Sequence, residues 1–468
     1  MDDFLREIQT SLFREWINNQ KRDYYHLHQS ETDPDAIIIE NEYCYSYVTF
    51  NPQCIIELCV MNKRTDEMAF YLHFQFKTLK HAISLFEEMD QCIKKMIDQP
   101  ICRLLLCCSG GMTTAFFADK IKNGIKVLNL NMEVAATSYQ KIYNVAQNYD
   151  VILLAPQVSY VKLQVEKVFK NKLVLKIPTQ IFASYNVGAL ITFIEESLKH
   201  KENKYNGYVE PLASMMEIKT NKNVLAVSIN ANGENSHISY RLYNSHQDIV
   251  LDSNIIKSNI KLQDVLDALD TVVLQNEMID VISIALPGVM VEGNVYSGII
   301  EGGNHQLKEC LEKRYEKEIY LINDVNAAVV GYYASQNEYK SLAFLFQPIG
   351  RMAGSGIVVN GQLVRGMDHL AGEVALLPLN LSDAYLTLAN TPEGTLELVT
   401  KNIMSIIAIV APEAIVVYSD LILDSQDVSD EIKKALSQYP LKVYPQIIKV
   451  ENILEYILLG AMILSAKE

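Results

Sequence analysis

The sequence predicts an α/β protein made of several domains, and three observations lead to this fold class. The chain has 468 residues, more than one compact domain usually holds. Between residues 100 and 200, short apolar runs alternate with segments of helical periodicity, which is typical of a parallel sheet with crossover helices. Before residue 98, strand-like runs follow one another directly, which indicates a small α+β unit.

Composition argues against several classes of function. The formal net charge is −15, and neither a run of basic residues nor a helix-turn-helix offers a nucleic-acid surface. The eight cysteines lack metal-site spacing, so we expect no metal. No apolar run approaches the roughly 20 residues of a membrane span. The acidic start, Met1-Asp2-Asp3, is unlike a secretory signal, and we therefore expect a cytoplasmic protein with reduced thiols.

Residues 1–98 are expected to form a small α+β domain of unknown role. Apolar residues from Phe4 to Trp16 recur at helical spacing, and residues 79–97 read as a second amphipathic helix. Strands are expected at 36–39, 43–50, 54–60 and 68–76. Four histidines lie here, and their scatter favours surface or core positions over a phosphohistidine or metal site; they are His26, His28, His73 and His81.

Residues 100–200 are expected to form an open parallel-sheet α/β domain. Strands are predicted at 101–107, 126–132, 151–155 and 172–176. Helices are predicted near 114–123, 136–147, 160–169 and 188–199. Open sheets of this kind bind ligands at the carboxyl ends of their strands. The residue at that position after the first strand is Cys108.

The loop after the first strand can hold an anion beside a reactive thiol. It consists of Ser109, Gly110, Gly111, Met112, Thr113 and Thr114. Glycines let the backbone approach a bound group closely, and a threonine can cap the following helix, whose free N–H groups then face Cys108. Such donors favour a thiolate and hold a phosphoryl group. Cys108 is therefore the candidate phosphoryl acceptor.

Two alternatives compete with this interpretation. Cys107 is a rival nucleophile, but strand alternation directs its side chain to the opposite face from Cys108, where it packs. A low-molecular-weight phosphatase has the loop C-x5-R, and the corresponding position is Thr114 rather than arginine. Because the charge that stabilises a hydrolytic transition state is missing, a carrier is favoured over a hydrolase.

The segment around Cys108 resembles a known family. C-S-x-G-M-T-T at 108–114 is similar to the C-S-x-G-M-S-T phosphocysteine loop of the lactose/cellobiose-type IIB component of the bacterial sugar phosphotransferase system (PTS). The stretch DVILLAPQV at 150–158 resembles that family's D-V-V-L-L-G-P-Q-V. The resemblance covers roughly residues 101–200 and implies a phosphocysteine, a IIA or other phosphohistidine donor, and a IIC membrane subunit as partners.

Residues 223–468 carry a second resemblance, after a polar linker candidate at 199–223. The segment resembles the ROK family of sugar kinases and repressors, whose two α/β lobes of the actin/hexokinase type we expect at about 223–333 and 334–468. Five motifs in order support it: ALPGV at 285–289, INDVNAA at 322–328, GSGIVVNGQL at 354–363, AGE at 371–373 and APEAIVV at 411–417.

The ROK resemblance implies roles for three residues. Asp324 would be the base that accepts the proton of a sugar hydroxyl, and it would bind the sugar together with Asn323 and Glu373. The alternative for Asn323 and Asp324 is a structural cap at a helix start. The family's kinases are commonly dimers, so the resemblance also implies a homodimer.

The nucleotide-facing motifs of the family are damaged. The D-x-G-G-T-K hairpin corresponds to VSINANG at 227–233, and the second phosphate loop contains the bulky Met352. The late G-G-G turn has become YSD at 418–420, the zinc motif is missing, and Leu376 replaces a histidine. We therefore expect a domain that binds a sugar or sugar phosphate without ATP turnover, so no cofactor is firmly implied.

Three functions follow from these patterns. The first is a PTS-linked phosphoryl carrier with Cys108 as phosphocysteine. The second is an ATP- and Mg²⁺-dependent sugar kinase that uses Asp324 as base and carries an appended IIB module. The third is a sensor in which phosphorylation of Cys108 and sugar in the cleft jointly set a partner-binding state.

Overall fold

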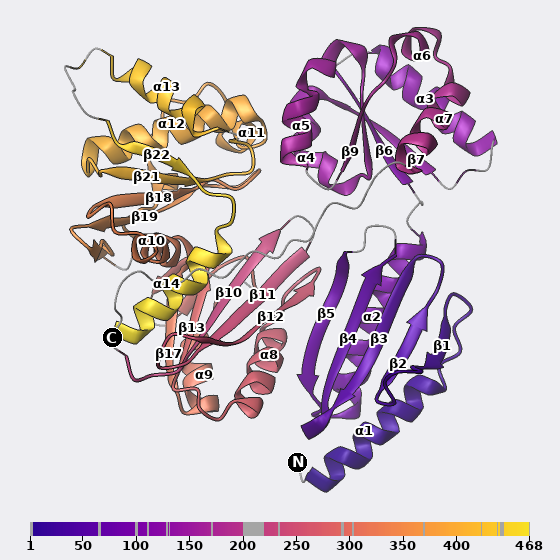
Figure 1. Ribbon diagram of the computed structural model, residues 1–468, viewed down its shortest axis with the longest axis vertical. Coiled ribbons are helices and arrows are strands. Elements are labelled where there is room, and N and C mark those ends of the chain that lie inside the picture. The colour runs from indigo at the N-terminus through magenta and orange to yellow at the C-terminus, as the bar shows by residue number, and fades with distance from the viewer. Residues whose placement is uncertain are drawn as a thin grey trace.

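The computed structural model shows an N-terminal α+β body, a parallel-sheet α/β body and a two-lobed α/β body (Figure 1). The described residues are 3–63, 67–98, 102–109, 112–127, 130, 132–169, 172–199, 220–232, 235–291, 294–301, 304–367, 370–422, 424–437, 439 and 444–467. Most of the linker candidate at 199–223 lies outside them. Short 3-10 turns occur at η1 (Pro52–Cys54), η2 (Tyr139–Lys141), η3 (Ala146–Asn148), η4 (Pro156–Val161) and η6 (Val374–Leu376).

The N-terminal body is an antiparallel sheet covered by two helices. Its elements are α1 (Asp3–Asn18), β1 (His26–Gln29), β2 (Ala36–Glu40), β3 (Cys44–Asn51), β4 (Ile55–Asn62), β5 (Met68–Gln75) and α2 (Leu79–Asp98). Phe13 of α1 and Phe86 of α2 are fully buried against the sheet, and Trp16 packs edge-on to Phe86. The expected elements are present. Strand β1 was missed because its polar sequence, HLHQ, carries little apolar alternation.

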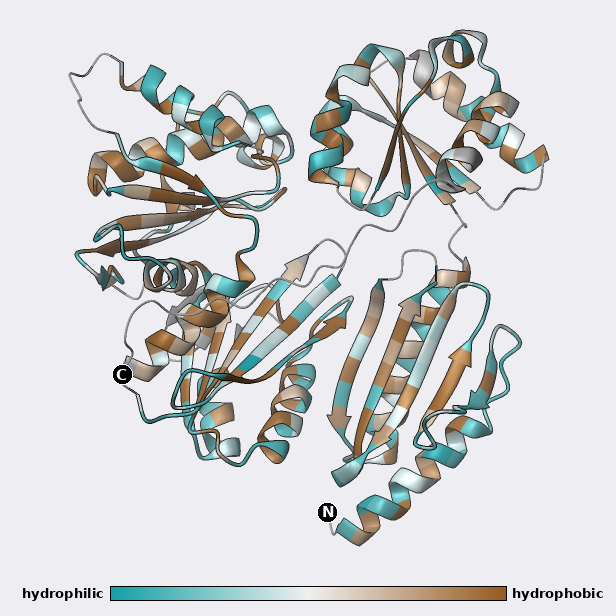
Figure 2. Ribbon diagram, in the orientation of Figure 1, coloured by the Kyte–Doolittle hydropathy of each residue, from teal (hydrophilic) through white to brown (hydrophobic). Residues whose placement is uncertain are grey.

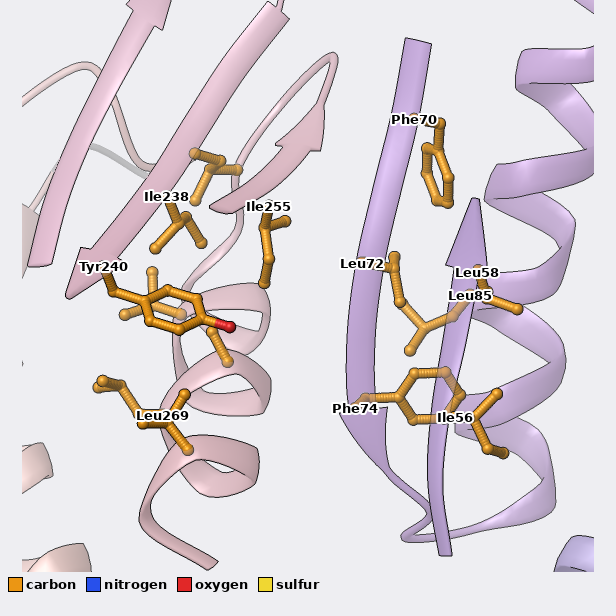
Figure 3. Packing of buried hydrophobic residues seen from close by; sticks show 14 of the residues in the cluster. Ile56, Leu58, Phe70, Leu72, Phe74, Leu85, Ile238, Tyr240, Ile255 and Leu269 are labelled. Atoms are coloured by element: carbon orange, nitrogen blue, oxygen red, sulfur yellow. The ribbon is translucent and has the colours of Figure 1, made fainter. Parts of the chain in front are cut away.

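This N-terminal sheet continues into the first lobe of the two-lobed body. In the described part of the chain, ten strands form one sheet in the order β1-β2-β3-β4-β5-β12-β11-β10-β13-β17. The junction is antiparallel, with Tyr71 of β5 opposite Ile256 of β12. Side chains from both sides of the junction, including Leu72 and Ile255, belong to one hydrophobic cluster (Figure 3). The N-terminal unit that we expected to end at residue 98 therefore shares one sheet with strands from residues 224–323.

Buried ion pairs reinforce the junction. Lys257 of β12 has a side chain only 4% exposed, and its ammonium lies 2.6 Å from Glu88 of α2 and 2.5 Å from Asp264. Nearby, Lys77 contacts Asp267 at 2.6 Å across the same junction. Because an unpaired buried charge is costly, each partner depends on the others being in place.

The parallel-sheet body comprises the described residues between 102 and 199, and its strands have the order β7-β6-β8-β9. Its elements are β6 (Cys102–Cys108), α3 (Met112–Val127), β7 (Met132–Ser138), α4 (Ile142–Val145), β8 (Val151–Leu154), α5 (Lys162–Val168), β9 (Leu173–Lys176), α6 (Thr179–Ser184) and α7 (Val187–Lys199). The strand expected at 126–132 is wrong, because the strand lies at 132–138. The helix expected at 136–147 was placed too early, because α4 begins at Ile142. Residues 132–138, whose sequence is MEVAATS, pair along the whole of β6 and bury Val134, so tertiary contacts outweigh local preference.

The remaining body has two lobes that repeat one strand order. The first lobe contains β10 (Val224–Asn232), β11 (Asn235–Tyr243), β12 (Ile249–Lys257), α8 (Leu262–Gln275), β13 (Val281–Leu286), β14 (Val289–Val291), β15 (Asn294–Tyr296), β16 (Asn304–His305), α9 (Leu307–Tyr315), β17 (Glu318–Asn323) and α10 (Asp324–Ala334). The second contains β18 (Leu342–Phe346), β19 (Gly354–Val359), β20 (Gln362–Leu363), α11 (Tyr385–Leu388), α12 (Pro392–Ile409), β21 (Ala414–Tyr418), α13 (Ser425–Ala435) and β22 (Gln446–Lys449). When the strands of each five-stranded part are numbered in chain order, both lobes have the spatial order third, second, first, fourth, fifth. This order is β12-β11-β10-β13-β17 in the first lobe and β20-β19-β18-β21-β22 in the second.

Helix α14 (Leu454–Lys467) packs against α10 between the lobes, as Figure 1 shows. The two backbones approach closely at glycines. A Cβ on Gly460 would lie 1.8 Å from the carbonyl oxygen of Ala327, and one on Gly331 would lie 2.0 Å from that of Tyr456. Only glycine fits at this crossing. Along the strands of both lobes, apolar residues form the buried faces (Figure 2).

Candidate functional site

Cys108 is the last residue of β6, at the carboxyl edge of the parallel sheet. It is 6% exposed and lies opposite Ser138 of the neighbouring strand β7. Cys107 is fully buried, and burial raises the pKa of its thiol to about 12, so it stays protonated at neutral pH. All eight cysteines are described, and none is in a disulfide.

The loop after Cys108 leads directly into a helix. Ser109 is exposed, and α3 begins at Met112, so its amino end follows the cysteine after a short connection. Gly110 and Gly111 lie outside the described residues, as do the side chains of Met112, Thr113 and Thr114. A helix of 16 residues presents unsatisfied N–H groups and the positive end of its dipole at this point.

Apolar side chains stand exposed at the same edge of the sheet as Cys108. Phe116, in the second turn of α3, is 52% exposed, and the Lys120 ammonium lies 5.1 Å from the centre of its ring. Tyr160 and Leu163, which follow the carboxyl end of β8, are 75% and 74% exposed. Exposed apolar groups around a polar centre are typical of a protein contact surface.

A cleft of about 1320 Å³ contains the second set of expected residues. It is lined by Asn323, Asp324 and Glu373, so the three expected sugar contacts are brought to one cavity. Asn323 also caps α10: its Oδ1 accepts from the backbone N–H groups of Val325 and Asn326 at 3.0 and 3.1 Å. Its Nδ2 donates to Gly288 O at 3.4 Å. The capping alternative is therefore present in the structure, and both polar atoms of Asn323 are engaged.

Asp324 and Glu373 supply carboxylates to the cleft. The pKa of Asp324 is raised to about 6, chiefly by burial; a backbone hydrogen bond from Val325 opposes the rise, and the nearby Glu373 carboxylate adds to it. Burial also raises the pKa of Glu373. The turn before Glu373 is tied to β19, because Ser355 N donates to Gly372 O at 3.0 Å. Gly372 has φ +92°, and a Cβ there would lie 1.9 Å from Ser355 O.

The loops that correspond to the nucleotide-facing motifs lie between the cleft and the parallel-sheet body. Residues 350–354 and 418–420 line the cleft. Leu421, just after β21, is 2% exposed and belongs to the hydrophobic core of the parallel-sheet body. Ile349, beside the second phosphate loop, packs against the same core. Met352, in that loop, is 45% exposed.

The parallel-sheet body also forms one wall of the cleft, which sequence reasoning missed. Tyr143, Asn144, Gln147, Lys167, Phe169 and Lys172 line it. The last four lie just before β8 and β9, so they stand toward the amino edge of the sheet. Cys108 is at the carboxyl edge, roughly 20 Å away along a seven-residue strand. Among the described lining residues, none comes from the Cys108 loop.

A second contact lies closer to Cys108. Tyr139 follows Ser138 directly, and its hydroxyl donates to Glu393 at the start of α12, at 3.1 Å. A smaller cavity of about 400 Å³ lies between Tyr139 and Gln140 on one side and Glu393 and Glu397 on the other. The parallel-sheet body therefore rests on the second lobe near both of its edges.

The four histidines of the N-terminal body are in ordinary structural positions. His73 is buried and within 2.9 Å of the Tyr240 hydroxyl, and His81 lies 2.9 Å from Asp267. His26 and His28 are exposed on β1. In the described ranges there is no cluster of three metal-ligating side chains. Among the same residues, no helix combines the length and apolarity that crossing a membrane demands.

Fold and site together define a small parallel-sheet domain with an edge cysteine joined to a two-lobed domain with a sugar-kinase-type cleft. The families follow from sequence comparison. The PTS lactose/cellobiose-specific IIB subunit family matches residues 103–192, and the ROK family matches residues 233–394. The chain thus carries a IIB domain and a ROK domain, and the resemblances stated for both segments are confirmed.

Individual relatives are distant. The chain is 25% identical over 114 residues to a xylose repressor of Caldicellulosiruptor bescii, a match that covers 23% of this chain and 28% of the repressor. Among solved structures, a ROK family protein from Streptococcus pneumoniae in complex with sucrose has 18% identity and a TM-score of 0.42, covering 52% of this chain and 97% of that one. A ROK hexokinase from Thermus thermophilus has 18% identity and a TM-score of 0.43, covering 52% and 99%.

Proposed function

We propose that this protein is a PTS-linked sensor in which Cys108 accepts a phosphoryl group and the ROK cleft binds a sugar or sugar phosphate without ATP turnover. The observation that carries the proposal is the position of Cys108. It ends a central strand of a parallel sheet, directly before a helix start, within the segment that matches the IIB family.

The chemical step is a transfer between two protein side chains. The Cys108 thiol loses its proton, and the thiolate attacks the phosphorus of a phosphohistidine on the donor protein, in line with the P–N bond. The S–P bond forms as the P–N bond breaks, and the electron pair remains on the imidazole nitrogen, which takes up a proton. The N–H groups at the start of α3 stabilise the phosphoryl oxygens. Phe116, Tyr160 and Leu163 offer the donor an apolar contact surface.

The absence of ATP turnover is supported by packing on the nucleotide side. The IIB domain buries Leu421 and contacts Ile349, which flank the loops that would hold a nucleotide in a kinase of this fold, and the bulky Met352 lies in the second of these loops. The carboxylates of Asp324 and Glu373 remain at the cleft, where they can accept hydrogen bonds from sugar hydroxyls.

Sensing is favoured over direct transfer from Cys108 to a sugar in the cleft. Lys167, Phe169 and Lys172 of the cleft wall lie toward the amino edge of the IIB sheet, whereas Cys108 is at the carboxyl edge, and a seven-residue strand such as β6 spans roughly 20 Å. In a transport carrier, the phosphoryl group would go instead to sugar held by a IIC membrane subunit. The ROK resemblance adds a homodimer to the proposed assembly.

Mass spectrometry of the intact chain tests the proposal. We expect incubation with phosphoenolpyruvate, the general PTS proteins and a IIA protein to add one phosphoryl group to the Cys108 peptide. Cys108→Ser should lose this acid-labile adduct, whereas the matched variant Cys107→Ser should keep it. An unmodified Cys108 peptide, or a phosphoryl group on Cys107, would refute the acceptor role.

A second candidate is an ATP-dependent sugar kinase, and one observation favours it. Burial holds the pKa of Asp324 at about 6, which suits a general base near neutral pH. A coupled assay with ATP, Mg²⁺ and a panel of hexoses and disaccharides decides between the two. Phosphorylation that disappears in Asp324→Asn would establish the kinase and overturn the non-catalytic cleft.

A further inference from the structure

The wall that the IIB domain contributes to the ROK cleft is used neither by phosphocysteine chemistry nor by the sugar contacts. It contains Lys167, at the end of α5, which faces the same cavity as Arg351 of the second lobe. The two side chains come from different domains and line one cavity because the domains pack together. A cavity lined from both domains can select a ligand that neither domain binds alone.

Cations from both domains line the cleft. Lys167 and Arg351 are exposed to the cleft, and neither has an ion-pair partner within the part of the chain that the structure describes. Lys449, another cation of the cleft, is paired with Glu451 at 2.5 Å. In a protein of net charge −15, two unpaired cations facing one cavity create a local site for an anion.

The other part of the cleft has a different character. Asp324 and Glu373 supply hydrogen-bond acceptors of the kind that bind hydroxyl groups, and both are held rigidly, at the start of α10 and after the turn at Gly372. The cleft volume of about 1320 Å³ exceeds the roughly 300–1,000 Å³ of an ordinary small-molecule pocket. It therefore has room for a ligand larger than a single unmodified sugar ring.

We propose that the cleft binds a phosphorylated sugar, whose hydroxyl groups contact Asp324 and Glu373 and whose phosphate monoester lies between Lys167 of the IIB domain and Arg351 of the ROK domain. This inference rests on the proposed sugar-binding role of the cleft and names the class of ligand. A phosphate monoester of a nucleotide has the same anionic chemistry. The sugar source is favoured because Asp324 and Glu373 supply acceptors for sugar hydroxyl groups in the same cavity.

Such a ligand would contact both domains at once. Its binding would stabilise their packed arrangement, and by linkage any change that separates the domains would weaken its binding. The phosphate subsite thus couples the sugar cleft to the IIB domain without a direct path from the thiol to the sugar.

Calorimetric titration of the full chain tests this. The probes are cellobiose, cellobiose 6′-phosphate, glucose 6-phosphate, inorganic phosphate and ATP. We expect a sugar phosphate to bind at least about tenfold more tightly than the free sugar, because hydrogen bonds to charged groups are the stronger ones. Lys167→Gln and Arg351→Gln should each weaken the sugar phosphate about tenfold and leave the free sugar within about twofold.

Lys122→Gln is the matched control, since Lys122 is an exposed IIB lysine outside the cleft, and it should change neither affinity. Thermal unfolding of each variant checks that the domains remain folded. Equal affinity for sugar and sugar phosphate, unaffected by Lys167→Gln and Arg351→Gln, would overturn the phosphate subsite but leave the sugar cleft intact. Tight binding of ATP alone would overturn the choice of ligand. No binding of any sugar or sugar phosphate would overturn both proposals for the cleft, whereas phosphorylation of Cys108 would remain a separate result.

Discussion

The packing of the IIB domain on the ROK domain depends strongly on Leu421. This side chain extends from the ROK lobe into the core of the IIB domain and is 2% exposed. Leu421→Ala removes three carbon atoms from that contact. At about 0.8 kcal/mol for each buried methylene-sized group, the loss is about 2.4 kcal/mol of packing free energy. Since 1.4 kcal/mol corresponds to a factor of ten, the equilibrium for domain packing should fall roughly fiftyfold.

Hydrogen exchange measured by mass spectrometry reports this change directly. Backbone amides in the IIB segment 139–148 and in the ROK segment 346–354 should lose protection in Leu421→Ala, because both segments lie at the packed surface. Leu376→Ala is the matched control, since Leu376 is 75% exposed and has little packing to lose. It should leave protection unchanged.

Two results would refute the reasoning. If protection in both segments is the same as in the parent protein, Leu421 does not hold the domains together. If protection falls equally throughout the second lobe, Leu421 supports the fold of that lobe and not the contact with the IIB domain.

Three further predictions concern stability and the cleft. Glu455→Ala should lower the free energy of unfolding by about 1.5–3 kcal/mol in denaturant titrations, because it removes one of the two carboxylates paired with the buried Arg241; Glu455 lies at 2.9 and 3.0 Å, and Asp252 remains at 2.9 Å. Burial lowers the pKa of His73 from 6.5 to about 4, so stability present above pH 6.5 should fall by roughly 3 kcal/mol as the pH drops to 4, measured by unfolding at each pH. Gly372→Ala should abolish sugar binding in calorimetry, because its Cβ would collide with Ser355 O.

Each of these has a control. Glu431→Ala removes a carboxylate from an exposed pair with Lys434 at 3.4 Å and should cost at most about 1 kcal/mol. His73→Gln should remove the extra loss of stability between pH 6.5 and 4. Gly298→Ala should bind sugar normally, because no atom lies within 4 Å of its added Cβ. A Gly372→Ala protein with unchanged sugar affinity would contradict the assigned geometry of the cleft.

Local pattern was sufficient for most of the elements and for the position of Cys108 at the end of a strand. An apolar run, a glycine-containing break and a helical period placed the cysteine there, where the structure has it. Its role as phosphoryl acceptor stays a prediction. The strand at 132–138 was misplaced because its sequence, MEVAATS, gives no clear strand pattern, and only pairing with β6 makes it a strand.

The sequence alone thus determined the order of helices and strands, the edge position of Cys108 and the two family resemblances, because each depends on neighbours within a few residues. Only the tertiary structure decided the continuous sheet from β5 to β12, the burial of Leu421 by the IIB domain and the presence of Lys167 and Arg351 in the lining of one cavity. The physical reason is that hydrophobic periodicity shows which face of an element is buried but not what buries it. Partners separated by more than 150 residues in the chain are chosen by packing across the whole molecule, and no local pattern records that choice.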